Sequence, residues 1–315
     1  MTNPWHPDHG DYPRDMIGYG RFPPDPRWPG DAVLALQIVV NYEEGGENAI
    51  LHGDAGSEFF LTEHITTPAI GRRHLTTESL WEYGSRVGFW RLWRELSRRQ
   101  LPVTCYGVTM ALGRNPEAVA AMKEAGWEIA THGLRWNVAP PENEDGERAQ
   151  IEETLALHAE ICGSPALGWY NRSSAQTYRI LSRIGGLLYF ADNYADELPF
   201  WADVDGTAEL FVPYALDAND MRFATSNGFA ESGQFFTYLR DSFDMLYREG
   251  LEGRPRMMSV GLHGRLSGRP GRTIGLIRFL DHVAQHDRVW TTTRAEIARH
   301  WREHHPPPTR PRTVW

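Results

Sequence analysis

Apolar segments typical of strands alternate with segments typical of helices along most of this chain, and this alternation constrains the fold most. The first apolar segment, 33–42 (VLALQIVVNY), is rich in β-branched residues, as strands buried on both faces are. We expect further strands at 102–109, 127–132, 166–171, 187–193, 210–214, 257–263 and 289–293, and helices at 78–99, 116–125, 148–162, 176–184, 234–249, 273–286 and 294–303. Strands separated by helices predict an α/β fold with a mainly parallel sheet.

A single β/α barrel accounts for this order better than an open dinucleotide-binding sheet does. No Gly-x-Gly-x-x-Gly turn follows any expected strand. We therefore expect one catalytic domain over residues 31–305, built as a closed but distorted β/α barrel. Residues 1–30 contain seven prolines and predict an extended N-terminal arm, and residues 306–315 predict a loose C-terminal tail.

Composition excludes several classes of protein. The formal net charge of −9 argues against a nucleic-acid-binding protein, and no apolar run is long enough to cross a membrane. The two cysteines, Cys105 and Cys162, exclude a disulfide framework. No secretory signal is visible near the start of the sequence, so we expect a cytoplasmic protein. We interpret His300, His304 and His305 as a solvated helix end.

Polar residues follow the expected strands at the points where those strands end. Catalytic groups of β/α barrels collect at the carboxyl ends of the strands. The residues at these ends are Asn41, Glu43 and Glu44, then His132, then Asn171 and Arg172, then Asp192, and finally His263. Each has a structural explanation when taken alone, but their equivalent positions predict one shared site.

The residue types at these ends suggest acid–base chemistry. Crowding of Glu43 and Glu44 is expected to raise the pKa of at least one carboxyl, which would suit a general base. His263 follows a buried strand and has the properties of a proton donor or a metal ligand. The guanidinium of Arg172 suits a developing oxyanion or a carboxylate.

The order of these motifs resembles the polysaccharide deacetylase (NodB-homology) superfamily. Members of that superfamily carry Asp-Asp-Gly after the first strand, His-x-x-x-His after the third, an arginine motif after the fourth, and Leu-x-His late in the chain. The matching segments here are 43–45, His132, Arg172 and 262–264. Within the superfamily, the chain is similar to the allantoinase analogues of bacterial purine utilisation. That similarity rests on the segments 12–15 (YPRD), 17–20 (IGYG), 41–48 (NYEEGGEN), 50–54 (ILHGD), 217–223 (DANDMRF) and 259–263 (SVGLH).

This resemblance implies a distorted barrel of the deacetylase type and a hydrolase that opens a cyclic amide ring, with allantoin as the expected substrate. It implies Glu43 as general base, His263 as general acid, and His132 and Arg172 as oxyanion stabilisers. Glu44 would orient His132 or the water molecule. The substrate-binding residues expected with them are Asn41, Trp136, Asn171, Asp192 and Trp201.

The deacetylase metal site is altered in this sequence. Deacetylases hold a divalent metal with one aspartate and two histidines, whereas here Glu44 replaces the aspartate and Trp136 replaces the second histidine. A catalytic zinc normally has three protein ligands. We therefore expect no metal and no other cofactor; zinc or another divalent ion at Glu44 and His132 is the alternative.

Three alternative functions stay open. The first is hydrolysis of another hydantoin or cyclic imide by the same residues. The second is a metal-dependent polysaccharide deacetylase, and the third is a non-catalytic binding protein built on a decayed barrel. The resemblance and the proline-rich arm also predict a homo-oligomer, with a tetramer as the expected form.

Overall fold

The structure is a computed structural model that describes residues 14–64, 69–136, 141, 143–309 and 311. The first part of the expected arm, 1–13, and positions 310 and 312–315 of the expected tail lie outside the described residues. Across the described residues, no helix has the combination of length and apolar character that crossing a membrane requires.

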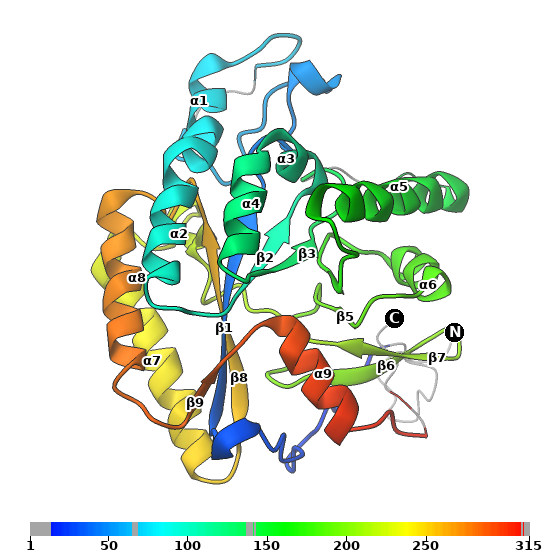
Figure 1. Ribbon diagram of the computed structural model, residues 1–315, viewed down its shortest axis with the longest axis vertical. Coiled ribbons are helices and arrows are strands. Elements are labelled where there is room, and N and C mark those ends of the chain that lie inside the picture. Colours follow the sequence, from blue (N-terminus) through cyan, green and yellow to red (C-terminus); the bar gives the residue numbers. More distant parts are fainter. Residues whose placement is uncertain (1–13, 65–68, 137–140, 142, 310, 312–315) are drawn as a thin grey trace, which may run out of the picture.

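A curled, mainly parallel sheet forms the centre of the molecule (Figure 1). Its strands run in the order β6-β7-β5-β4-β3-β2-β1-β8, and β9 also pairs with β1. All pairs are parallel except the β6–β7 hairpin. The strands are β1 (Leu34–Tyr42), β2 (Val103–Gly107), β3 (Glu128–Thr131), β4 (Gly168–Trp169), β5 (Tyr189–Phe190), β6 (Phe200–Val204), β7 (Thr207–Phe211), β8 (Arg256–His263) and β9 (Val289–Thr291). The predicted α/β class and deacetylase-type barrel are confirmed.

The barrel is not closed by strand pairing, in contrast to the expected closed form. In the described part of the chain, the strand order ends at β6 and at β8. Loop segments pair with the free edge of β8 instead: Met257 N donates to Glu197 O at 3.0 Å, and Gly261 N donates to Ala218 O at 3.1 Å. Strand β6 was not predicted, because the turn at Asp205 and Gly206 joins two strands without an intervening helix.

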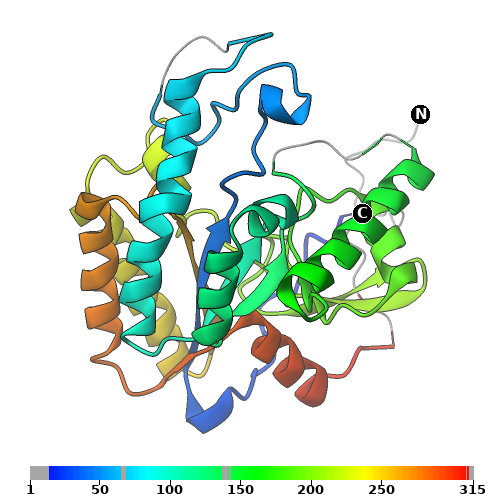
Figure 2. The ribbon, with the colours of Figure 1, turned by 45° about the horizontal axis from the view of Figure 1, so that its top comes forward.

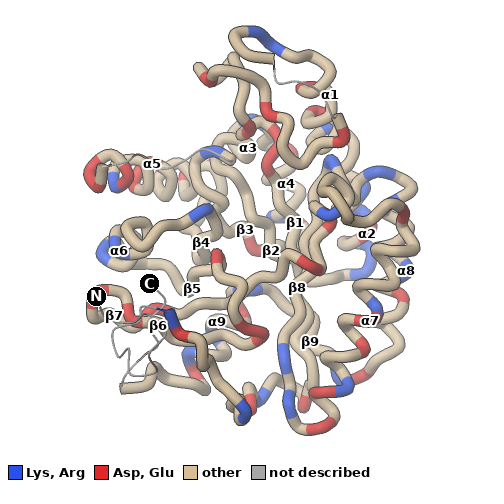
Figure 3. The backbone as a smooth tube through the Cα atoms, turned by 180° about the vertical axis from the view of Figure 1, so that it is seen from behind, with Lys and Arg blue, Asp and Glu red and all other residues tan. Residues whose placement is uncertain are grey.

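Helices surround the sheet. Helices α2, α7 and α8 lie beside β1 and β8, and α5 and α6 lie beside the β3–β5 part of the sheet (Figure 1). The helices are α1 (Leu75–Tyr83), α2 (Phe89–Ser97), α3 (Thr109–Arg114), α4 (Pro116–Glu124), α5 (Glu144–Cys162), α6 (Ala175–Ile184), α7 (Ser232–Leu251), α8 (Pro270–Val283) and α9 (Arg294–His304). Short 3-10 helices cover Pro29–Asp31, Ile50–His52 and Asp220–Ala224. Acidic and basic residues are interspersed along α7 and α8 (Figure 3).

The helix expected over 78–99 is interrupted by a π-helical turn, Gly84–Gly88. The residues at both ends of this turn, Gly84 and Gly88, have no room for a side chain. A Cβ atom at Gly84 would lie 2.6 Å from Cδ of Glu44, and a Cβ atom at Gly88 would overlap the backbone of Gly264. π-Helical turns are frequent at functional sites, and this one lets α1 and α2 approach the carboxyl ends of β1 and β8 closely.

The described part of the N-terminal arm packs against α9. Trp28 is buried, and its ring centroid lies 5.3 Å from that of His300. The ring nitrogens Nε2 of His300 and His305 both donate to Pro26 O, at 2.8 and 3.3 Å. The interpretation of these histidines as a solvated helix end is therefore wrong, because the arm covers two of them.

A buried arginine joins the strands inside the barrel. Arg294, at the start of α9, is fully buried, and its Nη1 donates to Gln37 Oε1 at 2.6 Å and to Ser259 Oγ at 2.9 Å. Its Nη2 donates to Pro213 O at 2.7 Å and to Val212 O. These acceptors lie on β1, on β8 and just after β7, so a single guanidinium satisfies polar groups from distant parts of the curled sheet.

Replacing this guanidinium should destabilise the fold. Arg294→Met removes the donors and leaves several buried acceptors unsatisfied, so we expect the free energy of unfolding to fall by roughly 3–5 kcal/mol. Urea denaturation followed by circular dichroism measures this change. Arg294→Lys keeps the charge but has fewer donors, so the stability of this variant should lie between those of the wild type and Arg294→Met. A loss below about 1 kcal/mol for the methionine variant would contradict the assigned role.

Candidate active site

Three strand ends bring the central residues of the site together. Glu43 follows the last residue of β1, His132 follows β3, and His263 is the last residue of β8. The parallel register aligns Asn41 with His263, and Tyr42 with Gly107 of β2. The carboxyl end of β1 points toward the segment that carries the 3-10 helix Ile50–His52 (Figure 2). The strand ends therefore lie at one level, beneath the loops that follow them.

Glu43 is the centre of the site. Its Oε1 atom lies 3.3 Å from Nε2 of His132 and 3.4 Å from Nε2 of His263. All three side chains are buried. The structure thus brings the carboxylate after the first strand together with both histidines. One carboxylate oxygen faces two imidazoles that come from different strands.

Arg265 neutralises the buried carboxylates. Its Nη2 lies 2.7 Å from Glu43 Oε2, and its Nη1 lies 3.5 Å from Glu44 Oε1. The same Glu44 oxygen accepts the backbone N–H of Arg265 at 3.2 Å, and Glu44 Oε2 accepts the backbone N–H of Glu43. Glu44 therefore contacts Arg265 and the backbone, behind Glu43, rather than His132.

Aromatic rings hold the Arg265 guanidinium in place. Its Cζ lies 3.9 Å from the ring centroid of Trp81 and 5.3 Å from that of Trp136, and its Nε donates to Leu61 O. Stacking on aromatic faces favours arginine over lysine at such a position. The guanidinium is fixed in a dry environment between two carboxylates and two indole rings.

Asp220 fixes the orientation of His263. Its Oδ1 lies 2.6 Å from His263 Nδ1, and its Oδ2 accepts the backbone N–H groups of His263 and Ser267 at 2.8 and 2.9 Å. Because the carboxylate is an acceptor, the Nδ1 atom carries the proton in this contact. The Nε2 atom of His263 is thereby presented to Glu43.

The two sets of charges shift the pKa values in opposite directions. Burial alone would raise the pKa of Glu43, but the charges of Arg265 and His263 hold it well below its usual range. Burial alone would lower the pKa of His263, but the carboxylates of Glu43 and Asp220 raise it to about 9. Burial and, to a smaller extent, the charge of Glu43 raise the pKa of Glu44, so the raised pKa expected for one member of the pair belongs to Glu44 and not to Glu43.

His132 has one nitrogen without a partner. Its Nδ1 atom is buried and has no hydrogen-bond partner among the described residues. The ring packs edge-to-face against Tyr170, with centroids 4.7 Å apart. An unsatisfied buried nitrogen is costly, so this atom is available for a polar group of a bound molecule.

Other predicted residues lie around this group, and Trp136 among them is buried. Trp136 stacks on Phe60, with ring centroids 5.9 Å apart. Arg172 also lies over Phe60, with its Cζ 5.6 Å from the ring centroid. Arg172 is exposed. Asp192 accepts the Tyr194 hydroxyl at 3.0 Å and the backbone N–H of Ser173 at 2.7 Å. The aromatic wall and Arg172 thus lie above the buried charges.

Three predicted binding residues have structural contacts. Asn41 donates to the Tyr214 hydroxyl at 3.2 Å and to Leu262 O at 3.3 Å. Asn171 packs directly against Gly133, the residue after His132. Trp201 lies on β6, at the far end of the strand order from β8, and donates from Nε1 to His305 O at 2.7 Å. The structure places Trp201 beside α9 and not with the Glu43 group, because β6 is an edge strand.

The donor set does not suit the deacetylase metal. Trp136 supplies no ligand atom, and Glu44 is held by the Arg265 guanidinium. A divalent cation next to this guanidinium would experience strong like-charge repulsion. Among the described residues, three ligand atoms lie within 4.8 Å of one another only in the group Asp244, His282 and His286, which lies elsewhere.

Sequence reasoning missed two residues of the site. Asp220 lies in the 217–223 segment that carries the family resemblance, but no strand end marks it. Arg265 follows His263 by two residues, and nothing in the local pattern shows that its side chain turns back toward Glu43. The one available signal was charge: two adjacent carboxylates expected in a buried site require a cation nearby.

Comparisons with known proteins identify the family of this chain. A sequence model for the family described as polysaccharide deacetylase matches residues 76–181. A Schizosaccharomyces pombe protein named as a polysaccharide deacetylase is 40% identical over 314 residues, which cover 93% of this chain and 98% of the relative.

Two crystal structures are similar over almost their whole length. The structure of PuuE allantoinase has a TM-score of 0.91 and 47% identity, and the match covers 95% of this chain and 100% of the other. A Pseudomonas aeruginosa PAO1 structure assigned to the polysaccharide deacetylases has a TM-score of 0.91 and 48% identity, covering 94% of this chain and 100% of the other. The chain belongs to the polysaccharide deacetylase family and is a hydrolase of that superfamily.

Proposed function

We propose that this protein hydrolyses a cyclic amide without a metal, and that its substrate is allantoin, which is opened to allantoate in purine catabolism. The observation that carries the proposal is the placement of one ionised carboxylate oxygen, Glu43 Oε1, between His132 Nε2 and His263 Nε2. The similarity to PuuE allantoinase at 47% identity supports this substrate.

The reaction would begin with a water molecule beside Glu43. The water oxygen forms a bond to a ring amide carbon while Glu43 accepts a proton from the water. The carbon–nitrogen bond of the tetrahedral intermediate then breaks, and His263 Nε2 donates a proton to the leaving nitrogen. Glu43 Oε1 and His263 Nε2 lie 3.4 Å apart, so the proton can return from Glu43 to His263 after the product leaves.

Binding groups surround this pair. His132, whose Nε2 atom faces Glu43, stabilises the developing oxyanion, and its Nδ1 atom has no hydrogen-bond partner in the described part of the chain. Arg172, which is exposed beside Phe60, and Asp192 bind polar groups outside the ring in this proposal. Trp136, which stacks on Phe60 and lies beside Arg265, closes one side of the proposed pocket. Glu44 acts as a positioning residue, because it holds Arg265 against Glu43.

The positive charge in this site is supplied by Arg265 instead of a metal ion. The guanidinium keeps Glu43 ionised, while the carboxylates of Glu43 and Asp220 keep His263 protonated, so both catalytic groups are in their active forms near neutral pH. This arrangement supports metal-independent hydrolysis over a metal-dependent deacetylase reaction.

We also propose a cytoplasmic homo-oligomer. The described part of the N-terminal arm exposes large apolar side chains at Met16, Ile17 and Phe22. A cavity of about 1110 Å³ separates part of this arm from the segment 193–197. Exposed apolar residues on this arm support contact with another copy of the chain.

Removing the proposed base should abolish most of the activity. Glu43→Gln is nearly isosteric but accepts no proton, so we expect kcat/KM for allantoin to fall by roughly 10²–10⁴-fold. Ring opening is measured by the appearance of allantoate. Glu82→Gln, an exposed change on α1, is the matched control and should retain full activity. A Glu43→Gln variant that keeps most of its activity would remove Glu43 from the mechanism.

The pH profile should depend on Asp220. Because His263 must be protonated and its pKa is raised to about 9, kcat/KM should stay level through neutral pH and fall as pH rises through about 9. Asp220→Asn removes one of the two carboxylates that raise this pKa, so the alkaline limb should move to lower pH by about one unit or more. The uncatalysed rate is subtracted at each pH. An unchanged limb in the variant would show that another group titrates.

Chelation should leave catalysis unchanged. We expect protein stripped of metal to open allantoin at the same rate as untreated protein. A panel of hydantoins, cyclic imides and N-acetylated sugars, assayed with the same sample, tests the substrate class. Loss of activity on chelation with recovery on addition of Zn²⁺ would instead favour a metal-dependent deacetylase.

A further inference from the structure

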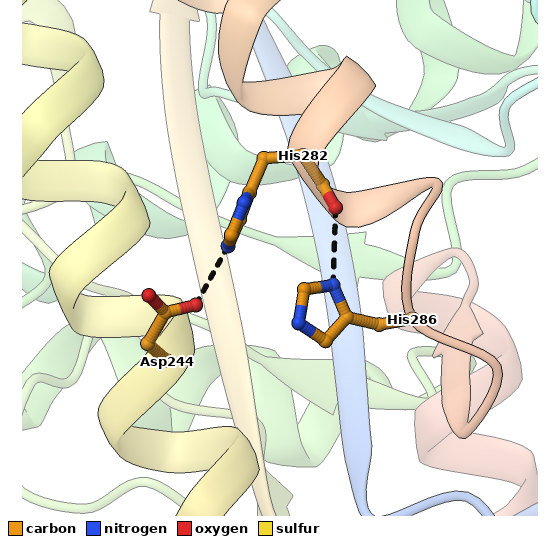
Figure 4. Close-up of side chains that lie close together, drawn as sticks. All are labelled: Asp244, His282 and His286. Carbon is orange, nitrogen blue, oxygen red and sulfur yellow. Dashed lines mark hydrogen bonds and ion pairs between the residues drawn. The ribbon is translucent and has the colours of Figure 1, made fainter.

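A second cluster of titratable side chains lies on the outer surface, between α7 and α8. Asp244 comes from α7, His282 from the last turn of α8, and His286 from the turn that follows (Figure 4). One ligand atom from each residue lies within 4.8 Å of the other two. His282 Nε2 lies 2.6 Å from Asp244 Oδ1. These residues have no part in the proposed hydrolysis.

The orientation of His286 is suited to binding a metal ion. Its Nδ1 atom lies 3.0 Å from the His282 carbonyl oxygen and donates to it, which leaves Nε2 as the ring nitrogen with a free lone pair. Histidine ligands of metal ions commonly donate their other ring N–H to a carbonyl or carboxylate. In Figure 4 the two imidazoles and the carboxylate border the same space.

Neighbouring aromatic rings limit the movement of the histidines. The centroid of Phe243 lies 4.9 Å from that of His286 and 5.6 Å from that of His282. Tyr247, one turn further along α7, stacks on Phe243 and also packs against His286, with its centroid 4.8 Å from that of His286. The two imidazoles are therefore partly buried and oriented, while the Asp244 side chain is about half exposed.

The spacing fits a tetrahedral transition-metal site with small adjustments. Ligand atoms at 2.0–2.2 Å from Zn²⁺ lie about 3.4 Å apart in a tetrahedral site. On metal binding, the 2.6 Å distance between Asp244 Oδ1 and His282 Nε2 would increase. The longest distance between ligand atoms in the group, which is at most 4.8 Å, would decrease. Residues four positions apart near a helix end can place two histidines on one ion. Binding requires His282 to release its Nε2 proton or move it to Nδ1.

The same chain contains a similar histidine pair that lacks these features. His300 and His304 are also four residues apart, and His304 Nδ1 donates to His300 O at 2.9 Å. The Nε2 atom of His300, however, donates to Pro26 O at 2.8 Å. That pair is not part of any three-ligand group among the described residues. It therefore provides a matched control for the surface cluster.

We propose that Asp244, His282 and His286 form a binding site for a divalent transition-metal ion of the Zn²⁺ type, with water completing the coordination. Ions of the Zn²⁺ type accept two imidazole nitrogens and one carboxylate oxygen as ligands, whereas Mg²⁺ and Ca²⁺ prefer oxygen ligands. Because the ligands come from α7 and from the end of α8, the ion links the two helices that lie beside β8. Its role is to stabilise this side of the barrel.

Titration of the full-length chain with Zn²⁺ tests the site. Metal-stripped wild-type protein should bind Zn²⁺ saturably by calorimetry, and its Tm should rise on binding. His286→Gln and Asp244→Asn should each weaken binding by about tenfold or more and remove the Zn²⁺-dependent rise in Tm. His304→Gln should behave as the wild type. Co²⁺ in place of Zn²⁺ should give visible absorption typical of a tetrahedral site.

Three results would overturn the proposal: no saturable binding to the wild type, unchanged binding in both His286→Gln and Asp244→Asn, or loss of binding in His304→Gln alone. Circular dichroism without metal shows whether each variant is folded, and the two ligand variants on different helices guard against a folding defect in one. Allantoin hydrolysis should be the same in His286→Gln and wild type, which separates this site from the Glu43 site.

Discussion

The buried guanidinium of Arg265, held between Glu43 and Glu44, is the interaction on which the site depends. Two adjacent carboxylates buried at the end of a strand repel each other and lose their hydration. Arg265 offsets both effects, since it contacts both carboxylates and stacks on Trp81. The surrounding backbone is shaped to admit it. Close approach of Gly84 to Glu44, and of Gly88 to Gly264, brings the π-helical turn Gly84–Gly88 against this group.

This constraint sets the protonation states used for chemistry. With Arg265 on one oxygen, Glu43 stays ionised, and its other oxygen faces His132 and His263. The Asp220 carboxylate, fixed by two backbone N–H groups, orients His263 and favours its charged form. The two groups to which we assign the roles of base and acid therefore lie 3.4 Å apart in a buried environment. In the metal-independent hydrolysis that we propose, such preorganised charges would be the main source of catalysis.

The proposed surface cation site concerns a different part of the same architecture. Strand β8 carries His263 at its end, and α7 and α8 lie beside it (Figure 1). Among the residues that the structure describes, the strand order ends at β8, so helix packing and loop contacts hold this edge in place. An ion bound by Asp244, His282 and His286 would stiffen the helix pair without contacting the reacting groups. Stability at this edge and catalysis at the strand ends can then be varied separately.

The sequence alone determined the α/β class, most strands, and the convergence of Glu43, His132 and His263, because periodicity identifies buried strands and parallel strands align their carboxyl ends. Tertiary structure decided what the strand ends contact. Asp220 lies 43 residues from His263, and Arg265 lies 221 residues from Glu44, so no local pattern encodes either pairing. It also placed Arg172 at the exposed rim and Trp201 on the distant edge strand β6. The physical reason is that side-chain directions in loops depend on long-range packing and charge, whereas strand and helix patterns reflect only which faces are buried.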